Sequence, residues 1–218
     1  MKTLTADAAV QSWLDALPAV ADTRPQTLRK AADAALAKGS VIPLDGAHPV
    51  LAGRAHVANA ALALLAADAG GDDEAALVER AVAECVAATE VAMAAAACGV
   101  RLELLPRVAA MLASCSARVP AARKRAVRAR LVEVTRAVGE AIAEEEALLH
   151  RGQAMLAAGQ ALADGATAMR QKAARHAVLG KALAMATEAR GLLAQAGAVA
   201  TAAYADETIA DIGTRLAA

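Results

Sequence analysis

The sequence of 218 residues has almost no aromatic side chains: it contains Trp13, Tyr204 and no phenylalanine. Yet 58% of its residues are hydrophobic, and many of these are alanine. Alanine has the highest helix propensity and brings little side-chain volume. We therefore predict an all-α fold whose helices pack at short interaxial distances, because the bulky side chains that would separate them are missing.

Signals for oxidation, export or membrane insertion are also missing. The cysteines, Cys85, Cys98 and Cys115, are odd in number and show no CxxC spacing, which argues against a disulfide framework or a zinc site. The N-terminal segment lacks the apolar core of a secretory signal, and the nearest apolar run, at residues 91–100, is too short to span a bilayer. We therefore expect a soluble cytoplasmic protein without a membrane span.

Neither sign of charge is in excess, because the chain has 23 basic and 23 acidic residues. Such a balance creates no overall field that favours nucleic acid or an anionic membrane. The nucleotide-binding, hydrolase, metalloprotease and calcium-binding motifs are absent. No histidine follows a glutamate by three residues, as di-iron bundles require. We predict neither a metal nor a cofactor.

Proline, glycine and capping residues predict the first helices. Thr5 is expected to cap a helix that ends at Pro18. Four further helices are expected over residues 25–38, 49–69, 73–98 and 103–117. The helix over 73–98 is apolar nearly all round, which is typical of a buried central helix.

From Pro120 onward, apolar residues recur at alternating spacings of four and three, the pattern of a heptad seam. Asp164 and Gly165 offer a turn within this region. We predict a long antiparallel helical hairpin with its tip there and arms of roughly 45 residues. The predicted neighbours are Gly180 with Leu149, Gly191 with Val138, Gly152 with Ala177, and Glu140 with Arg190. In the alternative, the arms break at Gly152, Gly191 or Gly197.

These elements predict one all-helical domain over residues 1–218, with a short-helix region at 1–118 and the hairpin at 119–218. The function that this architecture favours is a non-catalytic interaction or assembly module, which self-associates or binds a protein partner through heptad-like helix faces. Ile142, Leu149 and Leu156 lie outside the seam and would need cover from such a partner.

The segment 39–50 interrupts the helical pattern with prolines and glycines. Asp45 and His48 are the two residues in it that turn formation does not explain, so they are candidates for catalysis. They support an alternative function, a helical-bundle enzyme or small-ligand binder with a site near residues 39–59.

The helix that follows this segment adds further polar candidates. His56 and Asn59 are three residues apart and share a helix face, whereas Arg54 projects elsewhere. If the next helix packs on that face, Glu84 or Glu90 could reach His56 and orient it as a general base. Arg54, Asn59 and Glu84 are candidates for ligand binding. The competing interpretation is that all of these are satisfied polar groups at the edge of a bundle.

A basic cluster near residues 118–130 is the densest charge feature of the chain. Arg123, Lys124 and Arg128 are candidates for anion binding, because a helix start adds positive dipole character. The basic side chains are spread round the helix, however, and no aromatic side chains interleave to stack on bases. These two features argue against nucleic-acid binding and favour a solvated helix face.

Overall fold

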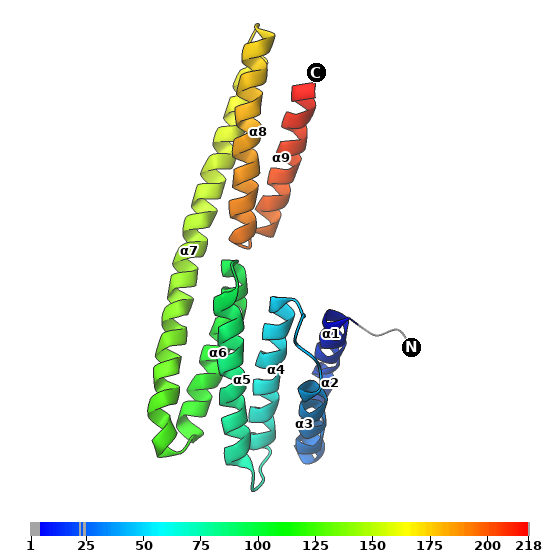
Figure 1. Ribbon diagram of the computed structural model, residues 1–218, viewed down its shortest axis with the longest axis vertical. Helices are drawn as coiled ribbons and strands as arrows, with labels where there is room; N and C mark the ends of the chain where they lie inside the picture. The colour runs from blue at the N-terminus through cyan, green and yellow to red at the C-terminus, as the bar shows by residue number, and fades with distance from the viewer. Residues whose placement is uncertain (1–4, 22, 24, 218) are drawn as a thin grey trace. The chain divides into compact units, whose positions relative to one another are not determined.

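The computed structural model describes residues 5–21, 23 and 25–217 (Figure 1). Within these ranges the chain forms helices joined by short connections, and it forms no β-strand. The predicted all-α class is therefore confirmed.

Residue contacts divide the chain into two compact units. The first comprises Met1–Ala95 and Val100–Gly139, and the second comprises Ala96–Gly99 and Glu140–Ala218. The border falls inside a helix, between Gly139 and Glu140, rather than at the predicted limit of the hairpin region. That residues 1–218 form a single domain stays a prediction.

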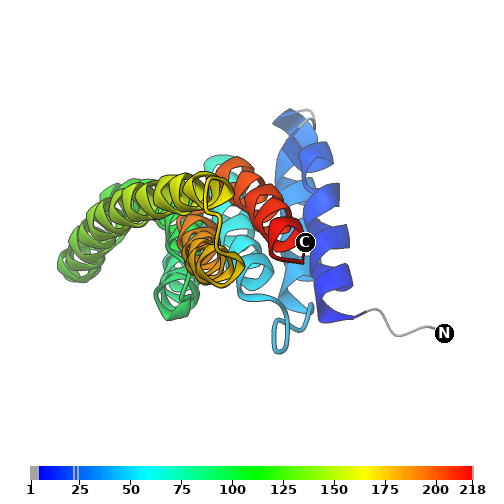
Figure 2. The ribbon, with the colours of Figure 1, turned by 90° about the horizontal axis from the view of Figure 1, so that it is seen from above.

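The first unit contains α1 (Ala6–Ala16), α2 (Pro18–Ala21), α3 (Pro25–Ser40), α4 (Pro49–Asp68), α5 (Glu74–Ala94), most of α6 (Cys98–Arg118) and the start of α7 (Ala121–Thr167). Thr5 caps α1 as predicted, and its hydroxyl accepts a hydrogen bond from the N–H of Ala8 at 3.4 Å. Pro25 and Pro49 begin their helices as predicted. Within this unit α4 lies between α3 and α5 (Figure 1, Figure 2).

Small residues let the helices of the first unit approach closely. Most of the buried side chains of α4 are alanines, while α6 contributes large leucines to the same core. Leu104 of α6 occupies the space that a Cβ on Gly53 of α4 would need. Small residues facing large ones fill a core without voids.

Three predicted helix limits are wrong. The helix predicted over residues 73–98 is α5, and it ends at Ala94. Cys98 instead begins α6, which was predicted to start at residue 103 and which contains Pro106. Helix α3 continues past Gly39 to Ser40. A Cβ on Gly39 would lie 2.5 Å from Cζ2 of Trp13, so this glycine makes room for the buried indole rather than ending the helix.

Among the described helices, α4 is long and apolar enough to cross a membrane by length and composition. The helix that meets this criterion is therefore α4, whereas the sequence analysis named residues 91–100 as the nearest candidate. Of the 18-residue stretch of α4 that meets this criterion, 56% is buried. Core helices of soluble proteins meet the same criterion, so this is weak evidence for a membrane span, and its absence stays a prediction.

The second unit contains the later part of α7, α8 (Lys172–Gln195) and α9 (Val199–Ala217). Asp164 and Gly165 lie inside α7, so the predicted tip is wrong, and the chain instead reverses over residues 168–171. Gly152 and Gly191 lie inside helices. Gly197 has a positive φ of 73° and separates α8 from α9, so the second predicted arm is broken there.

The displaced reversal changes which residues of α7 and α8 meet. A Cβ on Gly152 would lie 2.8 Å from Cγ of Leu193, and one on Gly159 would lie 3.1 Å from the carbonyl oxygen of Ala182. A Cβ on Gly180 or Gly191 would meet no atom within 4 Å. The predicted neighbours Gly152 with Ala177, Gly180 with Leu149, and Gly191 with Val138 are therefore wrong. Arg190, predicted beside Glu140, pairs with Asp206 of α9 at 3.2 Å.

Candidate functional site

The residues predicted in the segment 39–50 lie at the start of α4. The Nδ1 atom of His48 accepts a hydrogen bond from the N–H of Val50 at 3.4 Å, so His48 is the N-cap of α4. Its own backbone N–H donates to Oδ1 of Asp7 at 2.7 Å, which ties α1 to this cap. The side chains of Asp45 and His48 are exposed. His48 therefore has a structural task, and the catalytic assignment of both residues stays a prediction.

The predicted contact between His56 and Glu84 is present. Nδ1 of His56 lies 2.7 Å from Oε2 of Glu84, and each side chain is 20% exposed. This pair joins α4 to α5 and orients the imidazole, which is one requirement of a general base. Glu90 is exposed and lies six residues farther along α5, about 9 Å along the helix axis from Glu84.

The other two candidates on α4 face different helices. Nε of Arg54 lies 2.5 Å from Oε1 of Glu103 on α6, and this hydrogen bond raises the pKa of Arg54. Asn59 is only 3% exposed, and its Oδ1 adjoins Trp13 and Gly39 without a hydrogen-bond partner in the described residues. The polar residues predicted as one site are thus divided among three separate helix contacts.

Two members of the basic cluster, Arg118 and Arg123, hold helices together. Arg118 pairs with Asp68 at 2.7 Å and with Glu74 at 3.0 Å, which joins α6 to both ends of the turn between α4 and α5. Arg123 pairs with Glu79 of α5 at 2.7 Å. Lys124 is half-buried and Arg128 is exposed. Anion binding by Arg123, Lys124 and Arg128 stays a prediction.

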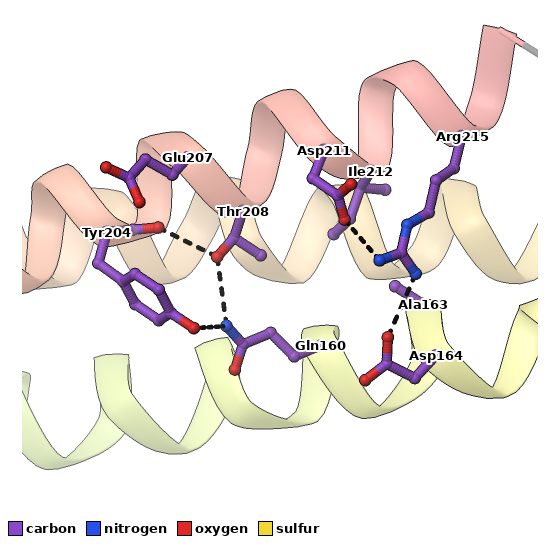
Figure 3. Close-up of a pocket in the computed structure, with 9 residues that line it drawn as sticks. All are labelled: Gln160, Ala163, Asp164, Tyr204, Glu207, Thr208, Asp211, Ile212 and Arg215. Carbon is purple, nitrogen blue, oxygen red and sulfur yellow. Dashed lines mark hydrogen bonds and ion pairs between the residues drawn. The ribbon is translucent and has the colours of Figure 1, made fainter.

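A polar cavity of the second unit lies between α7 and α9, and we call it the α7–α9 groove (Figure 3). Its volume is about 400 Å³. Its lining consists of Gln160, Ala163 and Asp164 from α7 and Tyr204, Glu207, Thr208, Asp211, Ile212 and Arg215 from α9.

A hydrogen-bond network occupies one half of the groove. Nε2 of Gln160 donates to the hydroxyl oxygen of Tyr204 at 2.8 Å and to Oγ1 of Thr208 at 3.3 Å. Oγ1 of Thr208 donates in turn to the carbonyl oxygen of Tyr204 at 3.0 Å. The phenol ring of Tyr204 is thereby held across the groove, reaching from α9 toward α7 (Figure 3).

An ion-pair network occupies the other half. Nη1 of Arg215 lies 3.2 Å from Oδ1 of Asp164 on α7, and Nη2 lies 2.7 Å from Oδ2 of Asp211 on the preceding turn of α9. Hydrogen bonds to Asp164 and Asp211 raise the pKa of Arg215. This arginine therefore connects the C-terminal parts of α7 and α9 (Figure 3).

The balance of charges decides what the α7–α9 groove can bind. Its lining carries three carboxylates and one guanidinium, so its formal charge is −2. Tyr204 is 51% exposed. The arrangement suits a cationic group with hydrogen-bond donors, which a carboxylate can pair and an aromatic face can attract. Neither histidine nor cysteine lines the groove, so no nucleophile–base pair of that kind is formed there.

The groove was not predicted from the sequence, although a signal for it exists. Tyr204, Thr208, Asp211 and Arg215 follow one another at spacings of four, three and four, which places polar side chains on one face of α9. Polar side chains that recur at heptad spacing, next to apolar side chains at the same spacing, indicate a continuous polar face along a helix. Its partner on α7 could be identified only once the position of the chain reversal was known.

No metal site accompanies these groups. Within the described ranges, no three histidine, cysteine, aspartate or glutamate side chains come together as a ligand set. Comparisons with protein-family models, with curated proteins and with solved structures found no match.

Proposed function

We propose that the protein is a non-catalytic α-helical interaction module whose α7–α9 groove holds a basic side chain of a protein partner. The observation that carries this proposal is the placement of Tyr204. It is half exposed although aromatic side chains are nearly absent from the chain, and Gln160 anchors its hydroxyl. Anchored, exposed tyrosines are typical of the residues that contribute most to binding at protein interfaces.

The charges around Tyr204 support a basic partner side chain. Glu207 is exposed and lies one turn farther along α9, at the same groove. A lysine or arginine of the partner can stack on the phenol ring and pair with Glu207. Arg215 already engages Asp164 and Asp211, so Glu207 is the carboxylate with which a new cation pairs.

Capture of partners from the native host tests this proposal. The full chain and the variants Tyr204→Ala and Glu207→Gln are used as bait, and bound proteins are quantified by mass spectrometry. Glu188→Gln, at an exposed glutamate on α8 outside the groove, is the matched control. We expect a partner that the wild type and the control retain and that both groove variants lose. An identical set of bound proteins for all four baits would contradict the proposal.

Self-association is a second candidate, favoured by the distribution of charge along α7. The first part of this helix is basic, with Arg123, Lys124, Arg125, Arg128, Arg130 and Arg136. The next part is acidic, with Glu140, Glu144, Glu145 and Glu146. Two antiparallel copies of α7 bring opposite charges together, and both copies make the same contact. Val132 and Ile142, which are exposed on this stretch, would gain cover.

The residues expected to need cover are only partly available for such a contact. Leu149 and Leu156 already pack in the core of the second unit, whereas Ile142 is 44% exposed. Sedimentation equilibrium in 50 mM and 1 M NaCl tests the charge pairing, because salt screens it. We expect association that weakens at high salt. A monomer at every concentration and salt level would exclude this mode of assembly.

The alternative function is an enzyme or small-ligand binder with a site near residues 39–59. Its support is a single contact, the one between His56 and Glu84. The other candidates lie on separate helix contacts or are exposed. We also propose that the protein acts in the cytoplasm, which is supported by the buried thiols of Cys85 and Cys115, neither of which forms a disulfide within the described residues.

A further inference from the structure

Helix α7 carries a second heptad seam on its exposed side. The buried residues Val127, Val134 and Ala141 lie seven apart on the side of α7 that packs in the core. On the other side, six exposed residues recur at alternating spacings of four and three. They are Arg128, Val132, Thr135, Gly139, Ile142 and Glu146. At 3.6 residues per turn these positions form one stripe along the helix, which we call the outer seam.

The outer seam exposes aliphatic side chains to solvent. Val132 is 69% exposed and Ile142 is 44% exposed, and both belong to the few large apolar residues that the described chain leaves at its surface. Exposed apolar side chains at heptad spacing are typical of a helix that packs against another helix. The outer seam therefore has the apolar positions of a helix interface.

Gly139 lies near the middle of the outer seam, where packing within the described residues does not require a glycine. A Cβ at this position would meet no atom within 4 Å. Glycine in a helix interior is less stable than alanine, so its presence here needs another reason. The distance between two packed helices depends on the side chains at their contact, and a glycine allows a close approach.

The order of the spacings indicates which helix fits. Read from either end, the outer seam has the spacings four, three, four, three and four. A second, antiparallel copy of α7, related by a two-fold axis at the level of residue 137, therefore places each seam residue opposite another seam residue. The facing pairs are Val132 with Ile142 of the second copy, Thr135 with Gly139, and Arg128 with Glu146.

These pairs are chemically complementary. Each aliphatic side chain faces an aliphatic one, and the small Thr135 faces the glycine. Arg128 and Glu146 are both exposed, and neither is in an ion pair within the described residues, so each can pair with the other copy. A parallel arrangement would instead place Arg128 against Arg128 and Glu146 against Glu146, and like charges in contact are unfavourable. The charges therefore favour the antiparallel pair.

We propose that two copies of the chain associate through the outer seams of α7, which cross antiparallel about a two-fold axis at the level of residue 137. This inference rests on the self-association proposed above as a second candidate function. It adds the register of the two helices and the residues that meet.

Exchange of the charges at Arg128 and Glu146 tests the register, with sedimentation equilibrium of the full chain in 50 mM NaCl as the measurement. Arg128→Glu brings glutamates together at both ends of the contact, and Glu146→Arg brings arginines together there. Each single variant should associate at least about tenfold more weakly than the wild type. An equimolar mixture of the two variants restores both pairs of opposite charge, so it should associate nearly as tightly as the wild type.

Matched variants separate these contacts from general effects. Lys181→Glu, at an exposed position of α8, makes the same change in net charge as Arg128→Glu and should associate like the wild type. Val132→Lys places a charge opposite Ile142 and should weaken association. Its control is Val199→Lys on α9, because Val199 is 79% exposed and lies outside the seam. Circular dichroism establishes that each variant is folded.

The outcomes distinguish this register from self-association in general. A wild type that stays monomeric at every concentration would overturn both. If the wild type associates but the folded single variants associate equally well, or if their mixture does not recover, the outer seam is not the interface, although self-association stands.

Discussion

Nη2 of Arg29 lies 2.5 Å from Oδ2 of Asp73, and this contact joins α3 to the start of α5. The same guanidinium donates through Nη1 to the carbonyl oxygens of Gly70 at 2.7 Å and Ala66 at 3.3 Å, at the C-terminal end of α4. Carbonyl groups at the end of a helix lack intrahelical partners and attract positive charge. One side chain therefore holds three helices at the turn between α4 and α5.

This contact makes stability depend on the ionisation of Asp73. The hydrogen bond from Arg29 holds the pKa of Asp73 below its ordinary value. The stabilisation is therefore complete above the unfolded-state pKa and is lost as the pH falls through the folded-state pKa. We expect Asp73→Asn to lower the Tm at pH 7 and to have little effect near pH 2, as measured by circular dichroism. A difference in Tm that stays constant down to pH 2 would contradict this interpretation.

Gly39 is required by its surroundings rather than by its backbone conformation. A Cβ at this position would lie 2.5 Å both from Cζ2 of Trp13 and from Oδ1 of Asn59. Gly39→Ala must displace the buried indole and should lower the free energy of unfolding by about 1–3 kcal/mol. Gly139→Ala in α7 is the control, because a Cβ there meets no atom within 4 Å. The control should gain about 0.5–1 kcal/mol from helix propensity, and urea unfolding measures both.

Two glycines distinguish the observed register of α7 and α8 from the predicted one. A Cβ on Gly152 would approach Leu193, whereas one on Gly191 would meet nothing. We expect Gly152→Ala to destabilise the protein by about 1–3 kcal/mol and Gly191→Ala to stabilise it by about 0.5–1 kcal/mol in urea unfolding. If Gly191→Ala proves the more harmful of the two, the helices are paired in a different register.

The buried cysteines should resist alkylation in the folded protein. Burial, with smaller effects from Cys115 and Glu84, raises the pKa of Cys85 to about 12. Because the thiolate is the reactive form, only about one Cys85 side chain in 10⁴ is reactive at pH 8. Iodoacetamide labelling followed by mass spectrometry should therefore be slow for the native chain and rapid in 6 M guanidinium chloride. Rapid native labelling of Cys85 would show that the core between α5 and α6 opens readily.

The starts of α1, α3, α4, α5 and α7 could be predicted from the sequence because they depend on neighbouring residues. The hydroxyl of Thr5 bonds to an N–H three residues later, and Pro49 has the φ angle that the first turn of α4 needs. The sequence also allowed a contact between His56 and either Glu84 or Glu90 if the next helix packed on that face, and the structure has the contact with Glu84. The remaining site predictions did not combine into one site, because Arg54 and Asn59 meet different helices.

The position of the chain reversal was decided by tertiary structure. Asp164 and Gly165 form turns readily, yet both continue α7. There Asp164 pairs with Arg215, which lies 51 positions later in the sequence. Asp164 and Arg215 both line the α7–α9 groove, so it exists only because α9 lies beside the part of α7 that was predicted to turn. The sequence by itself determined the helical class and most helix starts, since helix propensity and capping act over a few residues. Register, the reversal and the groove depend on which side chains a distant helix buries, and only the tertiary structure decided them.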